Sequence, residues 1–160
     1  MKAFSISLFF FVFLFAGCKT APKDFTLVFK MDRPKIYKSS IEINQDKSYH
    51  IQQQNMIFDL SADKTQDNSS EGKLSDEEFS ELTSLLAGGE LFKMENTYGF
   101  DKDSNSDKDP LGGLIYHLNY KEGEKEKYIL IHPNPSADYP KNLSKLIKFL
   151  NDFTSHHIKK

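Results

Sequence analysis

The stretch LSDEEFSELTSLLAGG, residues 74–89, decides how the rest of the chain is arranged, because it contains a complete helix signal. Ser75 and Glu78 form a capping box, in which each side chain satisfies an unpaired backbone amide at the helix start. Apolar side chains then follow at helical spacing on one face: Phe79, Leu82, Leu85 and Leu86. Two glycines provide the stop. We therefore expect a helix over about residues 75–87, with its apolar face buried against another layer.

A second amphipathic helix is expected near the end of the sequence. Pro140 suits a first helical turn, since it lacks the amide hydrogen that would be unpaired there. The apolar residues after it recur at helical spacing: Leu143, Leu146, Ile147, Leu150 and Phe153. This stripe predicts a helix over about residues 140–154 that needs the same apolar layer as the first.

Alternating apolar residues predict the strands that supply this layer. Residues 25–31 alternate, and residues 37–43 and 49–51 do so on either side of a turn-forming sequence. Residues 113–121 and 125–131 predict a second hairpin around a three-residue turn, with these residues sharing one face: Leu114, Tyr116, Leu118, Tyr120, Tyr128 and Leu130. The expected fold class is α+β, an antiparallel sheet of two hairpins plus short strands, covered on one face by two helices.

Two polar stretches predict loops within a single domain spanning residues 25–155. Residues 61–73 contain one alanine and otherwise nothing that gains by burial, so we expect a mobile loop there. Residues 101–112 predict a second such loop, which begins with regularly spaced aspartates.

That second loop offers the candidate metal ligands. The side chains that match positions 1, 3, 5 and 9 of a calcium-binding loop are Asp101, Asp103, Asn105 and Asp109. However, Ser106 replaces the turn glycine, and Gly112 stands where a bidentate glutamate closes the calcium shell. A solvated polar loop and a calcium site therefore both stay open as interpretations.

Composition excludes other classes. The formal net charge of −2 lacks the concentrated basic surface that nucleic-acid binding needs. The sequence has one cysteine, so it forms no internal disulfide. It contains neither His-Glu-x-x-His nor Gly-x-Ser-x-Gly, and we expect a protein that is not an enzyme and has no cofactor besides the calcium alternative.

The N-terminus has the layout of a secretory signal. Lys2 precedes an apolar run over residues 3–15 that is too short to span a membrane, and two small residues precede Cys18. This arrangement resembles the lipobox of bacterial lipoproteins. The resemblance implies a cleaved signal peptide over residues 1–17, palmitate-type acyl chains on Cys18 and a lipidated tether over residues 18–24. Lys19 replaces the aspartate that favours inner-membrane retention, which points to the outer membrane.

Residues 74–153 carry a second resemblance. A Leu-Ser-x-Glu-Glu-Phe-x-x-Leu helix, a Leu-Phe-x-Met-x-x-x-Tyr-Gly segment and a final hairpin–helix resemble small secreted bacterial lipoproteins and the emfourin inhibitors of thermolysin-like metalloproteases. This resemblance implies a binding domain. We expect an envelope protein held in the lipid bilayer through Cys18, whose non-enzymatic domain binds a protein partner. An emfourin-like protease inhibitor and a calcium-stabilised ligand-binding module are the alternatives.

Overall fold

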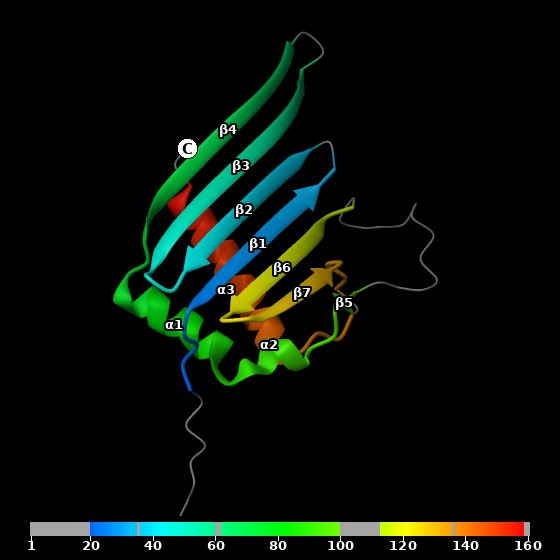
Figure 1. Cartoon of the computed structure of the whole chain (residues 1–160). Helices are drawn as coiled ribbons and strands as arrows, with labels where there is room; N and C mark the ends of the chain where they lie inside the picture. The colour runs from blue at the N-terminus through cyan, green and yellow to red at the C-terminus, as the bar shows by residue number, and fades with distance from the viewer. Residues whose placement is uncertain (1–19, 35, 60–61, 100–112, 136, 159–160) are drawn as a thin grey trace, which may run out of the picture.

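A computed structural model describes residues 20–34, 36–59, 62–99, 113–135 and 137–158, with the backbone alone described at 56–59 and 62–66. These residues form a mixed seven-stranded sheet in the order β4-β3-β2-β1-β6-β7-β5, with helices on one face (Figure 1). The strands are β1 (Phe25–Arg33), β2 (Tyr37–Asn44), β3 (Ser48–Asp59), β4 (Ala62–Lys73), β5 (Thr97–Tyr98), β6 (Ile115–Glu122) and β7 (Lys125–Ile131). The helices are α1 (Asp76–Leu86), η1 (Ala87–Gly89), α2 (Glu90–Lys93) and α3 (Lys141–His157).

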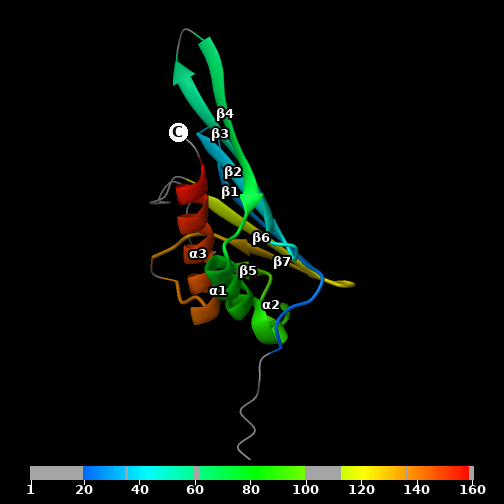
Figure 2. The ribbon, with the colours of Figure 1, turned by 90° about the vertical axis from the view of Figure 1, so that its left-hand side faces the viewer.

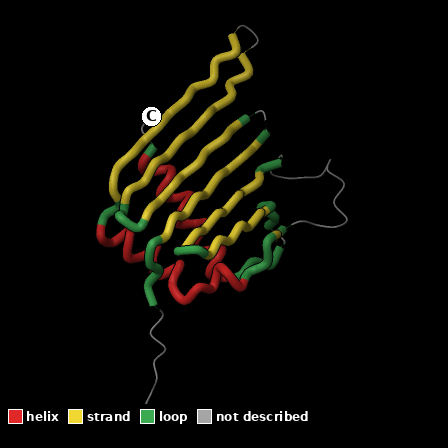
Figure 3. Tube along the Cα trace, viewed as in Figure 1, coloured by secondary structure: helices red, strands yellow, loops and turns green. Residues whose placement is uncertain are grey.

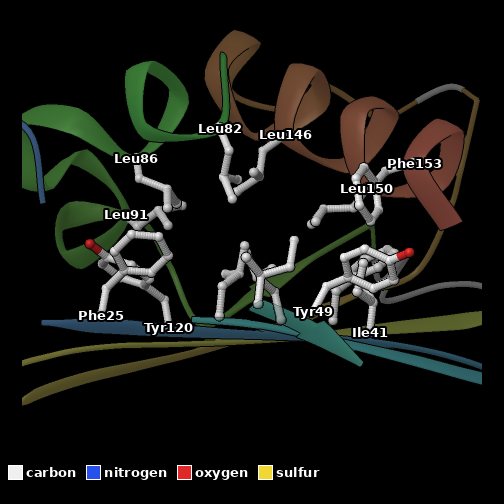
Figure 4. Packing of buried hydrophobic residues seen from close by; sticks show 14 of the residues in the cluster. Phe25, Ile41, Tyr49, Leu82, Leu86, Leu91, Tyr120, Leu146, Leu150 and Phe153 are labelled. Atoms are coloured by element: carbon white, nitrogen blue, oxygen red, sulfur yellow. The ribbon is translucent and has the colours of Figure 1, made fainter. Parts of the chain in front are cut away.

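The helical layer covers one face of the sheet and leaves the other face open (Figure 2). Leucines and a phenylalanine of α1, α2 and α3 project toward aromatic and aliphatic residues of the sheet (Figure 4). The capping box is present, because the Glu78 amide donates to Ser75 Oγ at 3.2 Å and the Ser75 amide donates to Glu78 Oε2 at 2.8 Å. The predicted α+β class and both predicted helices are confirmed.

β1 lies inside the sheet and joins its two halves. It pairs antiparallel with β2 on one side and with β6 on the other. Its odd-numbered residues face the helices, and Phe25, Leu27 and Phe29 are buried there. Its even-numbered residues therefore face the open side, because side chains alternate along a strand.

The prediction of a loop over residues 61–73 is wrong. Residues 62–73 form β4, which pairs with β3 from Ser48↔Lys73 to Asp59↔Ala62 (Figure 3). Backbone hydrogen bonds, rather than apolar side chains, build this strand, and an edge strand tolerates polar residues because much of it meets water. The sheet is thus larger than two hairpins plus short strands. The predicted loop over residues 101–112 lies outside the described residues.

The predicted register of the β6–β7 hairpin is off by one residue. Glu122 pairs with Lys125 across a two-residue turn, in which Gly123 has φ 57°. A one-residue slip moves every side chain of a strand to the other face. As a result Ile129 and Ile131 enter the core, whereas Tyr128 lies 48% exposed on the open face.

Candidate binding surfaces

The sequence-predicted site residues lie outside the described part of the chain. Cys18 precedes it, and the four candidate calcium ligands fall in the undescribed stretch 100–112: Asp101, Asp103, Asn105 and Asp109. Lipidation and calcium binding therefore stay predictions. The structure adds the position at which the chain enters the domain.

The segment after Cys18 lies against the domain from its first described residue. The Gly88 amide donates to the Thr20 carbonyl at 3.4 Å, and the Gly123 amide donates to the Asp24 carbonyl at 3.2 Å. Pro22, between them, is buried. Residues 20–24 were expected to form part of a tether, yet they make these contacts at the end of the sheet near α1 and α2 (Figure 1). The far end of the β3–β4 hairpin lies at the opposite end of the molecule (Figures 1 and 2).

β4 forms one edge of the sheet. Within the described residues it pairs with β3 and with no other strand. Half of the backbone N–H and C=O groups of an edge strand point away from the sheet, which makes such an edge a template for another strand. Asp67, Ser69 and Glu71 are exposed and share the open face. This edge therefore offers backbone hydrogen bonding beside two carboxylates.

Charged groups flank the β4 edge. His50 Nδ1 lies 4.0 Å from Glu71 Oε2 across the β3–β4 pair. At the nearby β2–β3 turn, hydrogen bonds donated by the Ser48 hydroxyl and amide lower the pKa of the Asp46 carboxyl. The Asp46 carboxyl thus stays ionised at neutral pH.

The opposite edge of the sheet, formed by β5, is much shorter than the β4 edge. β5 contributes only Thr97 and Tyr98, which pair parallel with β7. Lys127 Nζ donates to the Met94 carbonyl and to Asn96 Oδ1, which fastens the segment before β5 to the sheet. A short, side-chain-fastened edge of this kind is a poor template for strand addition.

A groove between α1 and α3 is filled with interactions of the chain itself. His157 stacks on Phe153 with ring centroids 4.0 Å apart, and its Nε2 lies 3.6 Å from Glu78 Oε1. Lys148 forms an ion pair with Asp152, which lies one turn later on α3. These side chains satisfy one another, so the groove offers few free groups to a ligand.

The open face carries a contact that the sequence reading missed. His117 Nδ1 lies 2.5 Å from the Tyr128 hydroxyl oxygen. The expected register placed these side chains on opposite faces, and the two-residue turn brings them together. The signal that could have located this contact is the Gly-Glu pair at residues 123–124, since a glycine with φ > 0 in the turn favours a two-residue hairpin.

The described ranges contain no group of three or more His, Cys, Asp and Glu side chains placed to hold a metal ion. None of their helices is long and apolar enough to cross a membrane.

No protein-family model matches the chain, and no curated protein is similar to it in sequence.

Proposed function

We propose that this chain is a lipid-anchored protein of the bacterial envelope, whose non-enzymatic domain binds an extended segment of a protein partner along β4. The observation that carries the proposal is the outer edge of this 12-residue strand, along which no other described strand pairs. An added strand would bond to its free N–H and C=O groups, and side chains at alternate positions would provide selectivity. Because Asp67 and Glu71 share one face, the preferred segment has basic side chains on that face.

The anchor geometry supports this use of β4. Lys19 alone separates Cys18 from Thr20, which already contacts the domain through Gly88. Each buried methylene of an acyl chain contributes about 0.8 kcal/mol, so two or more chains on Cys18 would hold the protein firmly. The α1–α2 end would then face the bilayer, and the far end of β3–β4 would point away from it, toward a partner (Figure 2). We place the anchor in the outer membrane because Lys19 follows the cysteine.

Site-specific photocrosslinking tests the proposal in cells that produce the full chain. A photoreactive residue replaces Ser69, which is exposed on β4, and in a matched control it replaces Lys145, which is exposed on α3. We expect a discrete adduct from position 69 and none from position 145. Mass spectrometry of the adduct should locate the crosslink within one extended segment of the partner.

Three outcomes contradict the proposal. Equal adducts from both positions, or none from position 69, would show that β4 is not the docking edge. An adduct between two copies of this chain would assign the edge to self-association instead.

A further inference from the structure

The open face of the sheet contains a trough of about 630 Å³ that runs across the strands from β6 to β4. One wall is formed by residues that lie opposite one another on successive strands: His117, Lys30, Ser40 and Gln52. The other wall is the next row on the same face, Asp32 with Lys38 and Gln54. The residues between the rows point their side chains toward the helix side, so their backbone forms the floor. The trough ends at β4, where Asp67 and Ser69 line it. It is a side-chain surface on the sheet face, whereas the proposed function uses the free backbone groups of the β4 edge.

We propose that this trough binds a linear, uncharged, hydroxyl-rich chain, namely a segment of a neutral glycan. Neighbouring strands lie about 4.8 Å apart, so a trough that crosses five strands is about 19 Å long. That length suits an extended oligomer better than a compact small molecule.

The charges of the trough favour an uncharged ligand. Lys30 and Lys38 are matched by Asp32 and Asp67, so the lining offers no excess of either sign. Gln52, Gln54 and Ser40 can each donate and accept hydrogen bonds, as the hydroxyl groups of a sugar do. The lining therefore complements hydroxyl groups rather than phosphates, carboxylates or amines.

Two oxygen atoms beside His117 also require donors. Asp32 Oδ1 and Asn119 Oδ1 are buried, and neither accepts a hydrogen bond from a described residue. Asn119 instead uses its amide nitrogen to donate to Glu126 Oε1 at 2.9 Å. An unsatisfied buried acceptor costs about 1–3 kcal/mol. Of these two residues Asp32 lines the trough, so a ligand hydroxyl at this end would recover the cost at Asp32 Oδ1.

An aromatic ring lies just outside this end of the trough. Tyr128 is 48% exposed, and its hydroxyl contacts His117, which lines the trough. This contact restrains the ring while leaving part of it open to stack on the C–H groups of a sugar.

The lining disfavours an extended peptide as the occupant. Met31 is the single apolar residue among the described residues that line the trough. Peptide recognition in a groove generally needs apolar pockets for side chains, or a strand edge for the backbone. The middle of the sheet face provides neither.

Nuclear magnetic resonance of the full chain in detergent micelles tests this inference. The probes are two neutral linear oligosaccharides, the tetramers of β-1,4-linked N-acetylglucosamine and of β-1,4-linked glucose. We expect saturable shifts of the Gln52 and Gln54 side-chain amide signals with at least one probe. Gln54→Ala and Asp32→Ala should each weaken binding about tenfold, the loss expected for one well-placed hydrogen bond. Lys121→Gln, on the same face outside the trough, is the matched control and should leave the Kd within about twofold.

Three results would overturn the inference. They are the absence of saturable shifts with both probes at millimolar concentration, equal weakening by Lys121→Gln, and tighter binding of a sulfated oligosaccharide or an unstructured peptide at the same residues. Backbone spectra of each variant show whether it is folded. Ser69 also lines the trough, but the two tests have different readouts. Mass spectrometry of the crosslink reports a protein segment and the Gln54 shifts report a glycan, so failure of either proposal leaves the other separately testable.

Discussion

Gly72 lies directly opposite Tyr49 in the β3–β4 pair, and a Cβ atom at position 72 would lie 2.9 Å from the Tyr49 hydroxyl oxygen. The Tyr49 ring packs edge-on against Phe153 of α3, with centroids 5.1 Å apart. The absence of a side chain at Gly72 thus leaves room for the ring that joins the edge hairpin to the helical layer. This contact explains why a mostly polar strand is held at its C-terminal end.

Gly72→Val should destabilise the fold, because the new side chain displaces a ring that is already packed against α3. Overpacking of this kind costs about 1–3 kcal/mol. The control is Glu71→Val, which adds a similar side chain on the exposed face and should change the free energy of unfolding by less than about 0.5 kcal/mol. Urea denaturation measures both. Equal losses for the two variants would contradict the steric explanation.

Ser75→Ala should remove about 1 kcal/mol of stability, because the amide of Glu78 loses its acceptor at the start of α1. Thermal unfolding should shift downward by about 2–4 °C. Ser75→Asp keeps an acceptor oxygen and should retain most of the stability. Ser80→Ala, at an exposed position within α1, is the matched control and should be close to neutral. An unchanged melting temperature for Ser75→Ala would argue against the cap.

Gly123→Ala should weaken the β6–β7 hairpin for a reason different from that at Gly72. No atom lies within 4 Å of a Cβ built at position 123, but the backbone has φ 57°. The left-handed conformation costs a residue with a side chain about 1–2 kcal/mol. Gly123→Asn should cost less, since asparagine tolerates this region. An equal free energy of unfolding for Gly123→Ala and the unaltered chain, measured by chemical denaturation, would refute the two-residue turn.

His117 should titrate below its ordinary pKa of 6.5, because burial disfavours the charged imidazolium. Asp32 opposes this shift and Lys30 adds to it, so Lys30→Gln should raise the pKa of His117 and Asp32→Asn should lower it further. Proton resonance of the imidazole ring against pH measures each value. If both variants shift the pKa of His117 in the same direction, the environment assigned to its imidazole is wrong. That environment includes the Tyr128 hydroxyl on β7.

The same shift predicts how stability depends on pH. The folded state binds its proton on His117 at a lower pH than the unfolded state does, so stability is lost as pH falls from about 6.5 through the folded-state pKa. His117→Gln should reduce the slope of unfolding free energy against pH in that window. An unchanged slope would show that His117 does not contribute to it.

Cys18→Ser should move the protein from the detergent phase to the aqueous phase in a detergent partition experiment. The variant lacks the thiol to which acyl chains would attach, and no described helix offers an alternative membrane span. Mass spectrometry of the unaltered chain should show a mature N-terminus at Cys18 with added acyl mass. An intact leader on an unmodified thiol would contradict the anchor.

Local patterns predicted the helices and the central strands because their signals are contained within a few residues. The capping box at Ser75 and the apolar stripe of α3 each specify a helix and the face that it buries. Alternation in β1 and β2 similarly predicted the buried positions, including Ser39 among apolar neighbours. The β4 edge proposed as the docking site was not predictable, because the polar sequence of residues 62–73 has no apolar alternation to mark a strand.

The sequence by itself determined which side chains of α1, α3, β1 and β2 face the core, since burial of apolar surface selects those faces wherever the chain pairs. Tertiary structure alone decided that residues 62–73 join the sheet, because backbone hydrogen bonding to β3 leaves no mark in the side-chain pattern of β4. It also decided the β6–β7 register, since a turn shorter by one residue exchanges the two faces of β7. That exchange places Tyr128 beside His117, the residue that lines the β6 end of the trough.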